Sequence, residues 1–294
     1  MTDLLLEQKN KEQCNFLLSM EEREELEVEL LLQAVFQLYG YDFRHYAKAS
    51  LYRRIKNLQG REHKRYISEL TSAIIHDKYI FDRFLQEMSI TVTDMFRDPQ
   101  LFNLLKNIVI PKLQTYPSIN IWIAGCATGE EAYSIAILLH EAGLLERSRI
   151  YATDYNNSSI AIAEKGIYPL KNIRKYNENY LAAGGQSSFS SYYHQKYDGA
   201  LFDSFLRDKI TFAQHNLMKD ESFAQMHLVL CRNVMIYFDS HLKNRVLHVI
   251  KDSLVQRGFL MLGDKETLEL TDVTYDFETM SPRSRIYQKK LQLD

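Results

Sequence analysis

The chain has 294 residues, of which 46% are hydrophobic and 25% charged, the ordinary balance of a globular protein with a buried core. A formal net charge of −2 at pH 7 argues against a surface built for many phosphate contacts, and so against nucleic acid as a partner. The sequence contains no signal-peptide pattern, no apolar run long enough for a membrane span and no CxxC pair among Cys14, Cys126 and Cys231. These features predict a folded cytosolic protein with reduced thiols and without a metal site.

The first 110 residues are predicted to be helical. Nine acidic residues lie within residues 1–40, whereas residues 52–65 carry six basic ones. Within residues 46–58, leucine and isoleucine recur at helical spacing, and Arg53 and Lys56 fall on the opposite face. Thr93 or Asp94 is placed to cap a helix that begins near Pro99.

From residue 119 onward, short apolar runs alternate with amphipathic segments. The runs INIWIAG, RIYATD, DKITFAQ, HLVLCRN and GFLMLG predict strands, and the segments between them predict helices. The alternation predicts an α/β fold with a parallel sheet that ends in an antiparallel hairpin of YDFETM and SRIYQKK. Residues 167–212 are too long for an ordinary connection. We expect them to form a small insertion with strands of its own, rather than a flexible loop, because their many aromatic side chains require burial.

The first predicted strand is followed by the turn AGCATGEE, residues 124–131. Gly125 and Gly129 allow the backbone to approach a ligand at the carboxyl edge of the sheet, where open α/β sheets bind nucleotides. Glu130 and Glu131 follow in the first helical turn, where they would repel a phosphate, so the turn suits a nucleoside with a cationic tail such as S-adenosylmethionine. The alternative is that both glutamates only complement the helix dipole, and the turn alone leaves this open.

Further polar residues follow the other predicted strands at the same edge. Asp154 is placed to accept hydrogen bonds from ribose hydroxyls, although it can also act as the N-cap of the next helix. Asn216 and Asn233 offer a donor and an acceptor together, which suits an adenine edge or an amino-acid group. A turn-forming role is the alternative for Asn216.

The ordered motifs TVTDMFRD, IWIAGCATGEEAYSIA, YATDYNNSSIAIAEKGIYP and CRNVMIYF resemble those of the CheR-type chemotaxis receptor methyltransferases, over about residues 30–290. This family transfers a methyl group from S-adenosylmethionine to glutamate side chains of chemoreceptors. The resemblance implies a tail at residues 1–20, a helical N-terminal domain at 21–90 and a linker with a connecting helix at 91–118. It also implies a Rossmann-like class I S-adenosylmethionine-dependent methyltransferase domain at 119–294, with a small antiparallel β insertion at 167–212.

The resemblance also implies roles for single residues. The chemistry of methyl transfer, rather than the resemblance, makes Arg97 the catalytic candidate for orienting the acceptor carboxylate or for closing over the cofactor, because its fork of donors matches a carboxylate. Tyr237 is the second catalytic candidate, for lining the methyl channel. Arg53, Arg54 and Lys56 are expected to face the acidic methylation helices of chemoreceptors, with an ordinary solvated face as the alternative. Thr91 stands where the family commonly has asparagine. The expected cofactor-binding residues are Thr91, Thr93, Arg97, Gly125, Glu131, Asp154, Asn216, Leu217, Asn233 and Val234.

A glutamate acceptor is already ionised at pH 7, so methyl transfer to it requires no general base. We therefore expect a protein-glutamate O-methyltransferase that uses S-adenosylmethionine and no metal, and that acts as a cytoplasmic monomer reaching the membrane only through its receptors. Two alternatives remain open. One is a cofactor-binding regulator or scaffold without activity, and the other is a methyltransferase for another protein or for a small-molecule carboxylate.

Overall fold

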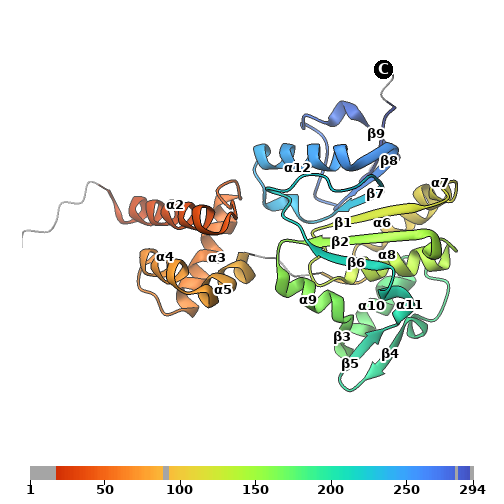
Figure 1. Cartoon of the computed structure of the whole chain (residues 1–294), viewed down its shortest axis with the longest axis horizontal. Coiled ribbons are helices and arrows are strands. Elements are labelled where there is room, and N and C mark those ends of the chain that lie inside the picture. Colours follow the sequence, from red (N-terminus) through yellow and green to blue (C-terminus); the bar gives the residue numbers. More distant parts are fainter. Residues whose placement is uncertain (1–17, 89–92, 282–283, 292–294) are drawn as a thin grey trace, which may run out of the picture. The chain divides into compact units, whose positions relative to one another are not determined.

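The computed structural model describes residues 18–88, 93–281 and 284–291, which divide into two compact units (Figure 1). A helical unit contains the described residues up to Arg44 together with Lys48–Phe84. An α/β unit contains His45–Ala47 and the described residues from Leu85 onward. The short segment His45–Ala47 therefore belongs to the α/β unit, although the chain on either side of it belongs to the helical unit.

The helical unit is built from helices whose apolar residues are buried together, which confirms the predicted helices for residues 18–88. Its first helix begins with a capping box, in which Ser19 Oγ accepts from the Glu22 N–H and Glu22 Oε2 accepts from the Ser19 N–H. The same helix ends at Gly40, whose φ of 75° suits glycine. Residues 1–17 of the expected tail lie outside the described residues. The helices are α2 (Met20–Tyr39), α3 (Lys48–Arg61), α4 (Ile67–His76) and α5 (Lys78–Met88), of which only the residues up to Phe84 belong to this unit.

A helical stretch also precedes the first strand of the α/β unit. It consists of α6 (Pro99–Leu104), one π-helical turn (Leu105–Val109) and α7 (Ile110–Leu113). Pro99 lies in the first turn of α6, where a missing amide donor costs nothing. Asp98 occupies the N-cap position of α6, so the expectation that Thr93 or Asp94 caps this helix is wrong.

Within the described residues, seven strands form one sheet in the order β6-β2-β1-β7-β8-β10-β9. Every neighbouring pair from β6 to β8 in this order is parallel, whereas β10 runs antiparallel to both β8 and β9. The predicted α/β fold with a terminal antiparallel hairpin is confirmed. The strands are β1 (Ile119–Ala124), β2 (Ser148–Asp154), β6 (Ile210–Gln214), β7 (Met226–Cys231), β8 (Leu254–Leu262), β9 (Phe277–Thr279) and β10 (Ile286–Lys289).

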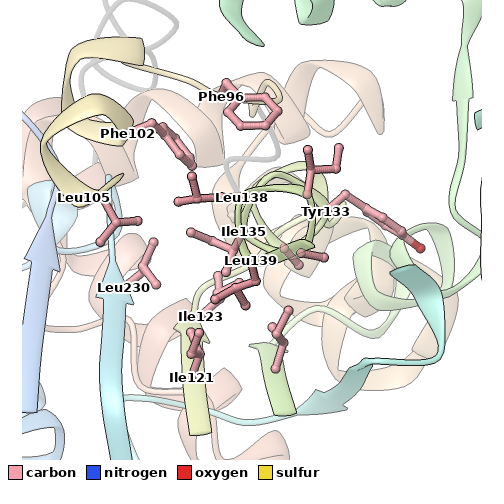
Figure 2. Packing of buried hydrophobic residues seen from close by; sticks show 14 of the residues in the cluster. Phe96, Phe102, Leu105, Ile121, Ile123, Tyr133, Ile135, Leu138, Leu139 and Leu230 are labelled. Atoms are coloured by element: carbon pink, nitrogen blue, oxygen red, sulfur yellow. The ribbon is translucent and has the colours of Figure 1, made fainter. Parts of the chain in front are cut away.

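Helices cover both faces of this sheet. Ile121 and Ile123 of β1 pack against α8 and residues 99–113 (Figure 2). Trp122 lies between them in the sequence and packs on the other face, in the cluster that contains residues of α12, because successive side chains of a strand alternate between faces. The carboxyl ends of the parallel strands form one edge of this sheet, which is the edge where ligands bind in such folds. The helices of this unit include α8 (Glu130–Glu141), α9 (Asn157–Lys165) and α12 (Ser240–Ser253).

The segment between α9 and β6 forms a small antiparallel sheet in the order β3-β5-β4. Phe189, Tyr192 and Phe202 of this segment are buried. The expected insertion is therefore confirmed, and the flexible-loop alternative is wrong. The expected boundary at residue 212 is wrong, because β6 begins at Ile210 and belongs to the main sheet. Helix α10 in this segment was not predicted from the sequence. Its elements are β3 (Ile167–Pro169), α10 (Leu170–Ala182), β4 (Tyr193–Lys196), β5 (Gly199–Phe202) and α11 (Ser204–Arg207).

Candidate active site

The candidate residues of the α/β unit lie at one edge of the sheet. Gly125, Asp154, Asn216 and Asn233 stand at or just after the carboxyl ends of β1, β2, β6 and β7, four strands that are adjacent and parallel. The N–H of Gly125 donates to the Thr153 carbonyl oxygen at 2.8 Å, which joins the ends of β1 and β2. The topology therefore brings together residues that are separated by more than one hundred positions in the sequence.

The turn after β1 is shaped by close packing and by an unusual backbone. Gly125 has a φ of +79°, and a Cβ atom at this position would lie 2.5 Å from Val234 Cγ2. Only glycine fits there without a shift of Val234, so two expected cofactor-binding residues are in direct contact. Ala127, in the same turn, has a φ of 47°, a left-handed conformation that costs a residue with a Cβ about 1–2 kcal/mol.

Asp154 stabilises this strained turn. Its Oδ2 accepts a hydrogen bond from the Ala127 N–H and its Oδ1 accepts one from the Asn156 N–H, both at 2.9 Å. Burial raises the pKa of the Asp154 carboxyl, and these backbone N–H groups act in the opposite direction. The N-cap of α9 is Asn156, whose side chain accepts from the Ser158 N–H, so the capping alternative for Asp154 is wrong.

The two glutamates of the turn have separate surroundings. Glu130 is buried, with Oε2 accepting from the Thr128 hydroxyl at 2.7 Å and Oε1 from the Tyr176 hydroxyl at 3.2 Å. Burial raises the pKa of Glu130. Since Tyr176 belongs to α10, this carboxyl group joins the insertion to the glycine turn. Glu131 instead forms an ion pair with Arg232, with Nη1 and Oε1 2.9 Å apart.

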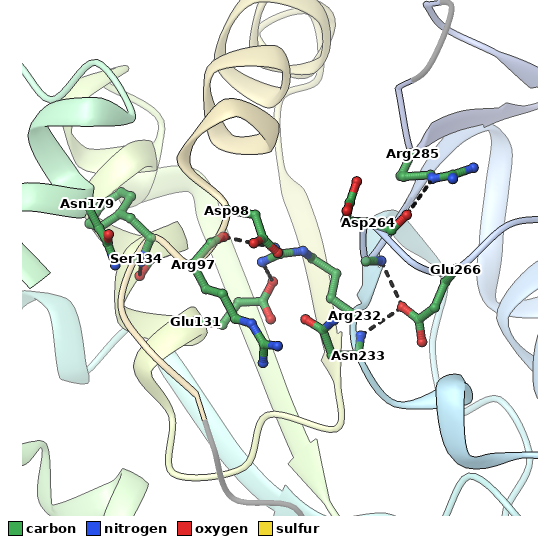
Figure 3. Close-up of polar contacts among 12 residues, drawn as sticks. Arg97, Asp98, Glu131, Ser134, Asn179, Arg232, Asn233, Asp264, Glu266 and Arg285 are labelled. Carbon is green, nitrogen blue, oxygen red and sulfur yellow. Dashed lines mark hydrogen bonds and ion pairs between the residues drawn. The ribbon is translucent and has the colours of Figure 1, made fainter. Parts of the chain in front are cut away.

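Arg232 links three segments of the site and was not among the residues predicted from the sequence. The Nη2 atom of this buried side chain donates to Asp98 Oδ2 at 2.8 Å and to the Arg97 carbonyl oxygen at 2.9 Å (Figure 3). Burial opposes the charge of Arg232, but Glu131 and Asp98 raise its pKa above the ordinary value. The guanidinium also lies over the Phe102 ring, 5.5 Å from its centroid. The signal in the sequence was an arginine directly after the buried strand HLVLC.

Glu266 organises the backbone after β7 and was also missed. Its Oε2 accepts from the N–H groups of Asn233 and Gly263 at 2.7 and 2.8 Å. Its Oε1 accepts from the N–H groups of Val234 and Met235 at 3.1 and 2.8 Å. Burial raises the pKa of Glu266 against the effect of these donors. The carboxyl group thereby holds Asn233 in a left-handed conformation, with a φ of 58°.

The motif before α6 is attached to the α/β unit by its backbone. The Phe96 N–H donates to Ser134 Oγ of α8, and Asn179 of α10 donates to the Met95 carbonyl oxygen, both at 2.9 Å. Thr93 is half-buried in this loop, next to Asp94, which pairs with Lys175 Nζ at 2.6 Å. The expected cofactor-binding residue Thr91 lies outside the described residues.

The remaining candidates of this unit follow β6 and β7. Asn216 Oδ1 accepts from the Met218 N–H at 3.0 Å, which is the turn-forming role that the sequence left as an alternative. Leu217 is buried in the cluster on the α12 side of the sheet. Tyr237 is half-buried and ends the 3-10 helix η4 (Met235–Tyr237).

The basic residues of α3 differ in their partners. Lys56 Nζ lies 2.6 Å from Glu24 Oε1 of α2, and the Tyr52 hydroxyl donates to the other oxygen of the same carboxylate. Arg53 is exposed and Arg54 is half-buried. The charge of Lys56 is therefore largely balanced within the helical unit.

Among the described residues, histidine, cysteine, aspartate and glutamate side chains form no group of three or more suited to a metal ion. None of the helices in this described part of the chain combines the length and the apolar character needed to cross a bilayer.

Comparison with known proteins gives the family. Residues 91–286 match the S-adenosylmethionine-binding domain of CheR methyltransferases, and residues 26–89 match the all-α domain of the same family. Cher3 of Pseudomonas putida is 45% identical over 272 residues, covering 92% of this chain and 100% of that protein. A chemotaxis protein methyltransferase of the same organism, Cher2, is 30% identical, covering 71% of this chain and 77% of its own. That of Listeria innocua is 28% identical, covering 82% and 90%. The resemblance inferred from the four motifs is confirmed, and the chain belongs to the CheR methyltransferase family.

Proposed function

We propose that this protein transfers the methyl group of S-adenosylmethionine to glutamate carboxylates of chemotaxis receptors, forming glutamate methyl esters and S-adenosylhomocysteine. The observation that carries the proposal is the gathering of Gly125, Asp154, Asn216 and Asn233 at adjacent strand ends, in a chain whose residues 91–286 match the cofactor domain of this family. This edge is where an open α/β sheet binds a nucleoside.

The residues at the edge fit such a cofactor. Gly125 leaves no side chain between the turn and Val234, so the backbone itself can lie against a ligand. Asp154 is held by backbone donors, and each of its oxygens keeps a lone pair for a ribose hydroxyl. Glu131 pairs with Arg232 through Oε1, and its second oxygen suits a cationic amino group. The remaining expected contacts are Thr91, Thr93, Arg97, Asn216, Leu217, Asn233 and Val234.

Bound S-adenosylmethionine supplies a methyl group on a positively charged sulfur, with a neutral thioether as the leaving group. The acceptor carboxylate is ionised at pH 7, so the protein does not have to remove a proton. For this transfer, its residues would have to hold the carboxylate oxygen about 3–3.5 Å from the methyl carbon and exclude water. We assign the orientation of the acceptor to Arg97, because its fork of donors matches a carboxylate, and the lining of the methyl channel to Tyr237.

The receptor surface belongs to the helical unit in this proposal. Methylation helices are acidic, and the exposed Arg53 and the neighbouring Arg54 offer positive charge on one helix. Lys56 contributes less while it is paired with Glu24. We place the protein in the cytoplasm as a monomer, with no nucleic acid partner and with membrane contact only through receptors.

The test is methyl transfer from labelled S-adenosylmethionine to purified chemoreceptor cytoplasmic fragments, with the Arg97→Ala variant alongside. The proposal predicts label on receptor glutamates that is released by mild base, as expected for an ester, and a loss of most of this label with Arg97→Ala. Base-stable label, or cofactor binding without transfer to any receptor fragment, would contradict it.

A further inference from the structure

The segment His45–Ala47 forms an antiparallel bridge with the residues that follow the 3-10 helix η4. The Ala47 N–H donates to the Tyr237 carbonyl oxygen and the Asp239 N–H donates to the His45 carbonyl oxygen, both at 2.8 Å. Tyr46 and Phe238 are directly paired across this bridge. All of these residues belong to the α/β unit, whereas Arg44 and Lys48, on either side of the segment, belong to the helical unit.

Side chains reinforce the bridge. His45 Nδ1 lies 2.9 Å from Asp239 Oδ2, and the Tyr46 ring packs on the Phe238 ring with centroids 5.2 Å apart. Phe238 is buried in the cluster on the α12 side of the sheet, which fixes the bridge to the core. Asp239 is also the N-cap of α12, where its side chain accepts from the Leu242 N–H.

The η4 helix is therefore held at both ends. At its start, Glu266 accepts from the N–H groups of Val234 and Met235. At its end, the bridge holds Tyr237 and Asp239. A single 3-10 turn has weak internal hydrogen bonding, so the direction of the Tyr237 side chain depends on these anchors.

We propose that His45–Ala47 is a positioning segment that sets Tyr237 for methyl transfer. The inference rests on the proposed function, because Tyr237 is its candidate for lining the methyl channel. It adds His45–Ala47 to the residues that serve methyl transfer. This segment stands about 190 positions before Tyr237 in the chain and contacts the backbone around Tyr237 rather than the reacting groups. Lys48, the first residue of α3, follows the segment directly, so the chain passes from this anchor into the helix that carries Arg53 and Arg54.

The decisive variant is Ala47→Pro, which removes the N–H that donates to the Tyr237 carbonyl oxygen and adds no polar group. Tyr46 already pairs as extended backbone, the conformation that a following proline requires. Lys48→Pro is the matched control, because proline is tolerated in the first position of a helix. We expect Ala47→Pro to lower kcat on a receptor fragment about tenfold, the effect of one lost hydrogen bond, with an unchanged Kd for S-adenosylhomocysteine and an unchanged KM for the fragment.

A double-mutant cycle with Tyr237→Phe separates positioning from general damage. If the segment acts through Tyr237, Ala47→Pro has little further effect in the Tyr237→Phe background. The inference is overturned if the kcat of the double variant falls by the product of the two single-variant losses, or if Ala47→Pro keeps the wild-type kcat. Should Ala47→Pro fail to fold, His45→Ala decides in the same cycle, because it removes the contact with Asp239 and keeps the backbone. A wild-type enzyme that methylates no receptor fragment would instead overturn the proposed function, and the inference with it.

Discussion

Arg232 Nη1 lies 2.9 Å from Glu131 Oε1, and this buried ion pair joins the end of β7 to the first turn of α8. The same guanidinium holds the Arg97 carbonyl oxygen through Nη2. The glycine turn, the segment before α6 and the end of β7 are therefore fixed to one another by a single side chain. A residue in this position affects cofactor affinity and stability together.

Replacing Arg232 by methionine leaves Glu131 and Asp98 without their cationic partner. Breaking a buried ion pair from one side typically costs about 3–5 kcal/mol, and we expect a loss of this size in the free energy of unfolding measured with urea. Cofactor affinity measured by calorimetry falls as well, since Glu131 and Arg97 lose their support. The control is Arg174→Met, which removes an exposed i,i+4 pair with Glu178 and changes stability by less than about 0.5 kcal/mol. Equal stability of the two variants would contradict the role of Arg232.

Glu130 gives a pH-dependent prediction. Burial raises its pKa in the folded protein, so the folded state binds this proton more tightly than the unfolded chain does. The stability that follows from this difference is fully present below the unfolded pKa of about 4.3, and is lost as the pH rises through the raised folded pKa. Glu130→Gln cannot titrate, so its stability relative to wild type should increase as the pH rises toward 7. Urea unfolding of both proteins from pH 4.5 to 8 measures this, and parallel pH profiles would contradict it.

The sequence predicted most of the fold, because strand and helix periods and glycine positions are local signals. The positions of Gly125 and Asp154 at the ends of β1 and β2 were predicted for the same reason. Arg232 was not, because the adjacency of β1 and β7 brings it to Glu131, 101 positions earlier in the sequence. Glu266 was not, because the adjacency of β7 and β8 brings it to the backbone of Asn233. Helix α10 was missed because its buried residues are tyrosines, Tyr176 and Tyr180, within a polar stretch. Such residues show their role only when their hydroxyl partners are known.

Gly125 and Val234 allow a steric test. In Gly125→Ala the new Cβ meets Val234 Cγ2 at 2.5 Å and the backbone keeps a φ of +79°, so we expect a loss of stability and of S-adenosylhomocysteine affinity. Adding Val234→Ala removes the clash and leaves only the left-handed strain of about 1–2 kcal/mol. The double variant should therefore be more stable than Gly125→Ala in thermal unfolding, although Val234→Ala alone destabilises. If the stability losses of Gly125→Ala and Val234→Ala simply add in the double variant, the contact between these two positions is unimportant.

Asp154 separates cofactor binding from turnover. Asp154→Ala removes the acceptor of the Ala127 N–H and the group that we assign to the ribose. We expect S-adenosylhomocysteine binding, measured by calorimetry, to weaken more than turnover at saturating cofactor. Asp154→Asn keeps a side-chain oxygen for the turn and should lose less affinity. Unchanged affinity in Asp154→Ala would remove this residue from the cofactor site.

We expect two basic residues of α3 to contribute unequally to receptor binding. Lys56 is paired with Glu24 and Arg53 is exposed, so Arg53→Glu should weaken binding of an acidic receptor fragment more than Lys56→Glu does. Glu24→Gln frees Lys56 from its partner and should strengthen the same binding, most clearly at low ionic strength, where exposed charges are least screened. Titration of each variant with the fragment measures these affinities, and S-adenosylhomocysteine affinity serves as the control for folding. If Arg53→Glu binds the fragment as wild type does, the basic face of α3 is an ordinary solvated surface.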